Sequence, residues 1–268
     1  MMDFSRIRTL GLSPSSIAPI VTTVIILVVW QIASAMAWVP EYLLPSPLSI
    51  MKTIYIRREM LAVDTLITFY EIVASFLVAM AMGISLAMLV VRSRLFESAV
   101  YPLLVMSQAV PKVALAPLIL IWFGFGLSPK IIIGALVAFF PILINTVSGI
   151  RSVEQDSIFL FQSMGARPWK MFLHLRFPTA LPNIFGGAKV AITLAVVGAI
   201  IAEFIGANRG LGYVLIIANG MQDMRLLFAA LTLISLLAVL CYWVISFIES
   251  MVLDWHVSTR GAHGHGTA

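Results

Sequence analysis

The chain has 268 residues, of which 61% are hydrophobic and only 11% are charged, against roughly 25% charged residues in ordinary soluble domains. A soluble protein of this size cannot hide so much apolar surface from water, so the composition excludes a soluble enzyme, a disordered chain and a disulfide-rich secreted domain. The net charge of +5 comes from Lys and Arg residues scattered between apolar runs, which is typical of loops at an anionic membrane surface and gives no reason to expect nucleic-acid binding.

Six apolar runs are long enough to cross the hydrocarbon core of a bilayer as helices, which takes about 20 residues each. The runs are continuous and lack alternating polarity, which favours helices over a transmembrane barrel. We therefore expect an all-α polytopic membrane protein with one transmembrane domain over residues 17–255, between an N-terminal segment (1–16) and a flexible tail (256–268). The six predicted spans are residues 17–38, 72–91, 95–123, 131–150, 181–205 and 226–248.

The start of the chain shares features with a signal peptide. Arg6 and Arg8 precede the first apolar run, and Ala35-Met36-Ala37 is similar to a cleavage site. The run is longer than a signal peptide needs and five more spans follow, which favours an uncleaved first helix. If the N-terminus is cytoplasmic, more of the Lys and Arg residues between spans lie inside than outside, as the positive-inside rule requires. Both termini are then expected in the cytoplasm.

Two patterns concern packing rather than chemistry. Leu48, Met51 and Ile54 have helical spacing before the second span, which predicts an amphipathic helix on the outer surface. Gly83 and Gly134 fall within spans, where small residues allow helices to approach closely.

The third span is expected to be kinked or broken, because it contains prolines that interrupt helical hydrogen bonding. Lys112 lies in this span between Pro111 and Pro117. A charge at this depth must face protein or a wet cavity. Two interpretations remain open for Lys112: a cation lining the translocation path or its gate, and a structural ion pair or carbonyl contact. Lys189 lies close to the cytoplasmic end of the fifth span, and its side chain is expected to extend toward the membrane interface.

Glu203 is the acid deepest in the later spans and precedes a Gly-rich loop that contains Gly210 and Gly212. Pairing with Arg209, pairing with Lys112, and a place at an outer gate are three open interpretations of Glu203. The glycines allow turns and close backbone approach, so the loop is either a re-entrant connector or a segment that dips toward the path.

The segment between the fourth and fifth spans (151–180) is too charged to cross the bilayer and has helical signals. Ser152 with Gln155 fits a capping box, and Gly165 is a helix stop. Pro168 suits the first turn of a second helix, which Pro178 and Pro182 are expected to end before the fifth span. Two functions are open: an amphipathic helix on lipid headgroups, and a docking element for a cytoplasmic protein.

An aromatic stripe distinguishes the second short helix of this segment. Trp169, Phe172 and Leu173 stand at i, i+3 and i+4 and therefore share one face. Arg167 and Lys170 place two cations beside them.

This segment resembles the cytoplasmic loop of binding-protein-dependent ABC-importer permeases, in which Glu-Ala-Ala, three residues, Gly, nine residues and Ile-x-Leu-Pro follow one another. Gly165 is followed after nine residues by Leu175-Arg176-Phe177-Pro178, whereas Phe159-Leu160-Phe161 replaces Glu-Ala-Ala. Further motifs are similar to the subfamily of sulfonate, taurine and nitrate importers: Leu44-Pro45-Ser46-Pro47, Pro111-Lys112-Val113-Ala114-Leu115-Ala116-Pro117, Trp122-Phe123-Gly124-Phe125-Gly126, Phe139-Phe140-Pro141-Ile142, and Ala202-Glu203 followed by Gly210-Leu211-Gly212.

The resemblance implies a permease subunit that works as a homodimer with two ATPase subunits and a periplasmic binding protein in the inner membrane. The short helix would be a coupling helix, with ATPase contacts from Gly165, Ala166, Arg167, Pro168, Trp169, Lys170 and Phe172.

The chain has no G-x-x-x-x-G-K-[ST] phosphate loop. ATP and Mg would therefore belong to the partner, and we expect no catalytic residue, metal or cofactor here. A sulfonate, taurine, nitrate or pyrimidine vitamin precursor is the implied cargo. A secondary transporter without an ATPase and a non-transporting membrane scaffold are the alternatives.

Overall fold

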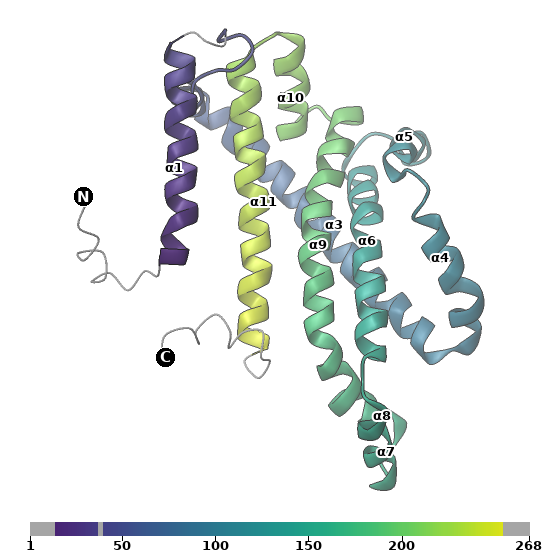
Figure 1. Cartoon of the computed structure of the whole chain (residues 1–268). Helices are drawn as coiled ribbons and strands as arrows, with labels where there is room; N and C mark the ends of the chain where they lie inside the picture. Colours follow the sequence, from purple (N-terminus) through teal and green to yellow (C-terminus); the bar gives the residue numbers. More distant parts are fainter. Residues whose placement is uncertain (1–13, 37–39, 254–268) are drawn as a thin grey trace.

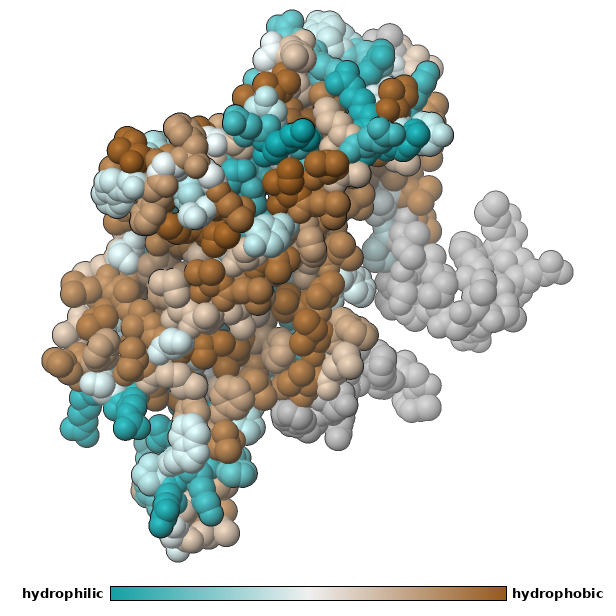
Figure 2. Space-filling model, turned by 180° about the vertical axis from the view of Figure 1, so that it is seen from behind, coloured by the Kyte–Doolittle hydropathy of each residue, from teal (hydrophilic) through white to brown (hydrophobic). Residues whose placement is uncertain are grey.

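The computed structural model describes residues 14–36 and 40–253, and these contain helices and no strand. Its long helices lie side by side as a bundle, with α3 (Arg58–Arg92) crossing behind α6 (Leu127–Arg151) and α9 (Phe177–Gly206) at a steep tilt (Figure 1). On the face that Figure 2 shows, apolar side chains cover the middle of the molecule and hydrophilic side chains gather toward its two ends. The all-α architecture is therefore confirmed.

In the described part of the chain, four helices are long and apolar enough to cross a membrane: α3, α6, the continuous helix Pro168–Gly206 that contains α9, and α11 (Met224–Val252). A bent pair, Phe96–Ser107 and Lys112–Phe123, makes a fifth span if it counts as one. In α1 (Pro14–Ala35), the apolar part Val21–Ala35 is shorter than these helices. The count of six spans therefore stays a prediction.

The third predicted span is broken, as the prolines indicate. A π-helical turn (Phe96–Val100) and α4 (Tyr101–Ser107) make its first half, and a 3₁₀ turn (Lys112–Leu115) and α5 (Ala116–Phe123) make its second half. The two halves meet at 87°. Pro111, extended at ψ 97°, precedes the second half, whereas Pro117 stands in the first turn of α5, where its missing N–H costs nothing.

The second span was predicted to begin at residue 72, and the helix that contains it begins earlier, at Arg58. Helix α3 has 35 residues and includes Asp64 and Glu71, both buried. A span predicted from an uncharged run cannot contain such residues, because an unpaired charge in the hydrocarbon core is costly. Here both acids have polar partners inside the protein, so the helix continues through them.

The centre of the bundle is a three-helix contact of small residues. A methyl group added at Gly198 of α9 would lie 2.7 Å from the Gly134 Cα of α6, and one added at Gly134 would lie 2.3 Å from Ser75 Oγ of α3. Gly83 packs in the same way against Ile142. The predicted close packing at Gly83 and Gly134 is confirmed.

Shorter helices close one end of the bundle. The predicted amphipathic helix is α2 (Pro47–Ile56), which begins at Ser46 as N-cap, and α10 (Leu211–Gly220) precedes α11. Arg57 pairs with Asp223 at 3.0 Å, and Arg225 forms a two-pronged ion pair with Glu41 at 2.9 and 2.8 Å. The hydrogen bond from Arg225 holds the pKa of the Glu41 carboxyl below its usual value. These exposed pairs fasten the α1–α2 connection and α2 to the start of α11.

Candidate functional site

A helical hairpin projects from the opposite end of the bundle (Figure 1). It consists of α7 (Gln155–Ser163) and α8 (Pro168–Met171), with Gly165 between them at φ +71°. The Ala166 N–H donates to the Phe161 carbonyl and the Gly165 N–H donates to the Gln162 carbonyl, at 3.0 and 2.9 Å. This is the Schellman arrangement, which ends a helix at a left-handed glycine. The predicted helix stop at Gly165 is confirmed.

Two details of the predicted hairpin are wrong. The capping box does not form: α7 begins after Glu154 as N-cap, and Ser152 Oγ donates to the Gly149 carbonyl at the end of α6. Pro178 does not end the second helix either, nor does Pro182. A π-helical turn (Phe172–Arg176) precedes Pro178 and provides the irregular hydrogen bonding that a proline requires, so the helix runs from Pro168 to Gly206.

The hairpin presents an aromatic and basic surface. Trp169 stacks on Phe172 with ring centroids 5.9 Å apart, yet Trp169 keeps 69% of its surface exposed. Arg167 and Lys170 are exposed, and neither forms an ion pair with any residue that the structure describes. Gly165 and Pro168 are exposed and Ala166 is half-buried. The residues predicted to contact an ATPase are therefore together on one projecting element.

The predicted residues of the translocation path lie in two separate places. Lys112 is half-buried on the broken span between Pro111 and Pro117, and its Nζ lies 4.5 Å from the centre of the Phe140 ring, a cation–π contact. Its place in a path stays a prediction. Glu203 makes neither predicted pairing, with Lys112 or with Arg209, among the described residues.

Glu203 instead helps to cap α10. Its carboxylate accepts hydrogen bonds from Thr68 Oγ1 at 2.7 Å and from the Gly212 N–H at 2.5 Å. Asp64 accepts from the Gly210 N–H at 3.0 Å, and Thr68 Oγ1 accepts from the Leu211 N–H at 2.8 Å. Three otherwise unsatisfied N–H groups of a helix start thus meet three buried side chains, two of them acidic groups at the positive end of a helix dipole.

The two glycines of the Gly-Leu-Gly motif have a steric role in this network. Gly210 has φ +113°, and a Cβ there would lie 2.1 Å from Glu203 Oε1; a Cβ at Gly212 would lie 2.8 Å from Oε2. Only glycine brings the backbone this close to the carboxylate. The helix that follows, α10, packs on α3, α9 and α11. Both interpretations of the loop, a re-entrant connector and a segment that dips toward the path, stay predictions.

An ion pair that the sequence search missed lies beside this network. Lys130 Nζ of α6 donates to Glu71 Oε1 of α3 at 2.6 Å, and the Lys130 and Glu71 side chains are only 10% and 1% exposed. The spacing of four polar residues on α3 is the signal that could have revealed it. Asp64, Thr68, Glu71 and Ser75 share one helix face, and all four are buried.

Lys189 forms an ion pair with Glu249, which stands near the end of α11. The pair joins α9 to α11, and both side chains are partly exposed. The expected extension of Lys189 toward the membrane interface stays a prediction.

Comparison with known proteins identifies the family. Residues 79–258 match the family described as binding-protein-dependent transport system inner membrane component. The chain belongs to this family. The permease is 36% identical over 244 residues to the formylaminopyrimidine transport permease protein ThiX of Halalkalibacterium halodurans, covering 91% of this chain and 97% of the relative. It is 35% identical over 240 residues to the riboflavin transport system permease protein RibX of Chloroflexus aurantiacus, covering 89% and 90%.

Another relative and a solved structure extend the comparison. The putative aliphatic sulfonates transport permease protein SsuC of Bacillus subtilis is 29% identical over 242 residues, covering 88% of this permease and 87% of the relative. The inward-facing MetNI methionine ABC transporter matches with a TM-score of 0.64 at 18% identity, covering 73% of this chain and 97% of that chain. This last likeness concerns the fold alone. Membership of this family and the apolar helices together show that the chain is an integral membrane transport permease.

Proposed function

We propose that this permease forms the translocation path of an ATP-driven importer, as a homodimer with two ATPase subunits and a periplasmic binding protein. The observation that supports this most is the projecting hairpin in a chain of the binding-protein-dependent family. Exposed Trp169 stacks there on half-buried Phe172, beside two exposed cations that form no ion pair with any described residue. Exposed Trp and Arg side chains are the residue types that dominate binding energy at protein interfaces. ATP and Mg bind to the ATPase subunits and not to this chain.

The hairpin is connected to the bundle in a way that suits a lever. From Pro168 the helix runs unbroken for 39 residues to Gly206, and α9 packs along both α6 and α3. Its far end carries Glu203, which caps α10 at the opposite face. A displacement of the hairpin is therefore transmitted along one rigid element to the other end of the molecule, as rigid-body transport movements require.

The orientation follows from the same assignment. An ATPase is cytoplasmic, so the hairpin, and with it both termini, face the cytoplasm, while α2 and α10 face the periplasm. The charge pattern of the connecting segments supports this orientation.

We further propose a small polar or anionic solute as cargo. The relatives' names specify formylaminopyrimidine, riboflavin and aliphatic sulfonates, and the binding protein selects among such solutes. A direct binding assay on the binding protein encoded beside this permease would identify the cargo.

A double substitution, Arg167→Glu with Trp169→Ala, tests the hairpin as the ATPase contact. We expect the ATPase subunit to co-purify at least tenfold less well, because truncation of an interface anchor costs roughly 2 kcal/mol or more. The measurement is the amount of ATPase bound to permease purified in mild detergent.

Phe125→Ala is the matched control, because Phe125 is 82% exposed and belongs to the segment between α5 and α6, outside the hairpin. The control should retain the ATPase. Equal ATPase retention by the double variant and the control would contradict the proposed contact.

The alternatives make different predictions. A secondary transporter would accumulate solute without nucleotide, and a scaffold would not move solute at all. The lever-like continuity of α8 with α9 favours the ATP-driven importer.

A further inference from the structure

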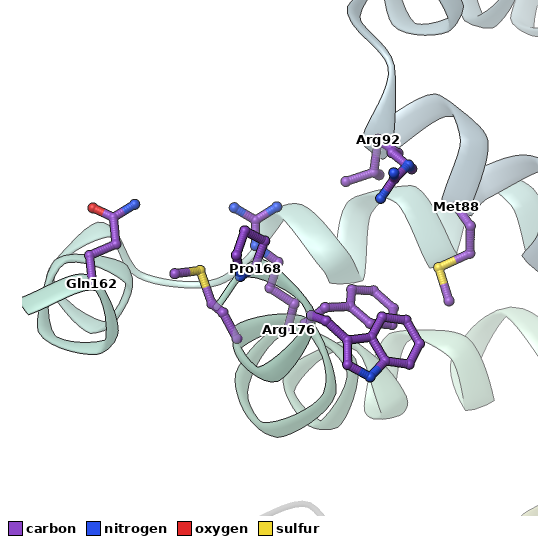
Figure 3. A pocket seen from close by; sticks show the side chains of 9 residues that line it. Met88, Arg92, Gln162, Pro168 and Arg176 are labelled. Carbon is purple, nitrogen blue, oxygen red and sulfur yellow. The ribbon is translucent and has the colours of Figure 1, made fainter. Parts of the chain in front are cut away.

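A cavity of about 530 Å³ lies between the end of α3 and the hairpin (Figure 3). Its volume falls within the range of roughly 300–1,000 Å³ that is usual for small-ligand sites. Met88 and Arg92 line it from α3, Gln162 and Pro168 line it from the hairpin, and Arg176 lines it from the π-helical turn that follows the hairpin. Val91, Trp169, Met171 and Phe172 complete the wall, so the cavity has an apolar lining with two guanidinium groups.

These two guanidinium groups have no anionic partner among residues 14–36 and 40–253. Neither Arg92 nor Arg176 forms an ion pair or a side-chain hydrogen bond with any residue in the described part of the chain. Three other arginines, Arg57, Arg151 and Arg225, each pair with a carboxylate. A cavity that collects two unpaired arginines is therefore complementary to an anion, and guanidinium groups suit phosphate oxygens in particular.

The apolar wall excludes a simple anion as the best occupant. Arg92 is the last residue of α3, so the cavity opens where a membrane-crossing helix ends. Leu89, one turn before it, is 47% exposed on the apolar surface of the helix. Met88, Val91 and Met171 give the cavity an apolar wall that continues from this surface of α3.

We propose that this cavity binds an anionic phospholipid, with the headgroup phosphate between Arg92 and Arg176 and an acyl chain against Met88, Val91 and Met171. The bound lipid would brace the hairpin against the end of α3. Basic pockets at the cytoplasmic ends of membrane helices are suited to such headgroups. The naming of this face as cytoplasmic rests on the proposed function, whereas the lipid site itself rests only on the cavity and its place at a helix end.

The test uses the full permease in mild detergent and phosphatidylglycerol as the probe, with bound lipid counted by native mass spectrometry. Arg92→Gln and Arg176→Gln should each weaken phosphatidylglycerol binding about tenfold, as expected for the loss of one charge-assisted contact. Arg94→Gln is the matched control, because Arg94 is exposed, stands two residues after Arg92 and does not line the cavity; it should bind the lipid as the unmodified chain does.

Two further probes distinguish an anionic phospholipid from a zwitterionic phospholipid and from a phosphate without acyl chains. Phosphatidylcholine should bind less well than phosphatidylglycerol, and glycerophosphate, which has no acyl chains, should not compete. Equal lipid binding by all three variants, or competition by glycerophosphate at the same concentration as the lipid, would overturn the proposal.

ATPase co-purification is measured on the same variants. If Arg92→Gln and Arg176→Gln release the ATPase while phosphatidylglycerol binding is unchanged, the cavity belongs to the ATPase contact and the lipid site is refuted. If lipid binding falls and the unmodified permease also fails to retain an ATPase, the lipid site stands and the proposed function fails.

Discussion

Lys130→Met is expected to destabilise the permease by about 3–5 kcal/mol, the usual cost of removing one partner of a buried ion pair. The substitution leaves the Glu71 carboxylate, whose side chain is 1% exposed, without its 2.6 Å contact to an ammonium group. Glu71 Oε2 already has no hydrogen-bond partner among the described residues, so no second donor is available to replace Lys130. The expected result is a large fall in the thermal unfolding midpoint and in the yield of monodisperse protein in detergent.

Two variants show whether this loss comes from the ion pair. Lys52→Met removes an exposed lysine of α2 and should leave the unfolding midpoint unchanged. Adding Glu71→Gln to Lys130→Met removes the stranded charge and should restore part of the loss, which a double-mutant cycle measures. If Lys130→Met unfolds at the same temperature as the unmodified permease, the pair has no role in holding α3 to α6.

Gly198→Ala is expected to cost about 1–3 kcal/mol, as is typical when a methyl group is forced into a filled core. The added Cβ would lie 2.7 Å from the Gly134 Cα and 3.4 Å from the backbone N and O of the same residue. Backbone atoms of a packed helix have no rotamer to change, so α6 and α9 would have to separate. The measurement is again the thermal unfolding midpoint of the purified permease.

The same helix offers a control substitution that is expected to change stability in the opposite direction. A Cβ at Gly186 of α9 would have no atom within 4 Å, so Gly186→Ala should stabilise the helix by roughly 0.5–1 kcal/mol through reduced backbone freedom in the unfolded chain. The two alanines should therefore shift the midpoint in opposite directions. Equal shifts would show that helix propensity, and not the α6–α9 contact, sets the response at Gly198.

The sequence predicts the helices well wherever the apolar runs are uninterrupted, because length and hydropathy alone then define a span. It fails where polar groups satisfy one another inside the protein. The second span was expected from residue 72, whereas its helix α3 begins at Arg58, since Glu71 finds a partner on α6 and Asp64 finds one just before α10. Hydropathy is a property of one segment, whereas these partners come from residues far away in the chain.

The candidate site, too, was predictable from the sequence in one part and not in another. The hairpin was predictable because its signals are local: Gly165 ends one helix and the spacing of Trp169 and Phe172 places them on one face. The surroundings of Glu203 were not, because its partners, Thr68 and the Gly212 N–H, are set by how α3, α9 and α10 pack. A π-helical turn before Pro178 likewise allowed a helix to continue where proline was expected to end it.

The most direct test of the account is transport by the reconstituted permease. Vesicles that contain the permease alone should not accumulate solute against a gradient, and vesicles that also contain the ATPase subunits, the binding protein and ATP should do so. Uphill accumulation by the permease alone, with neither nucleotide nor partner subunits present, would contradict the account.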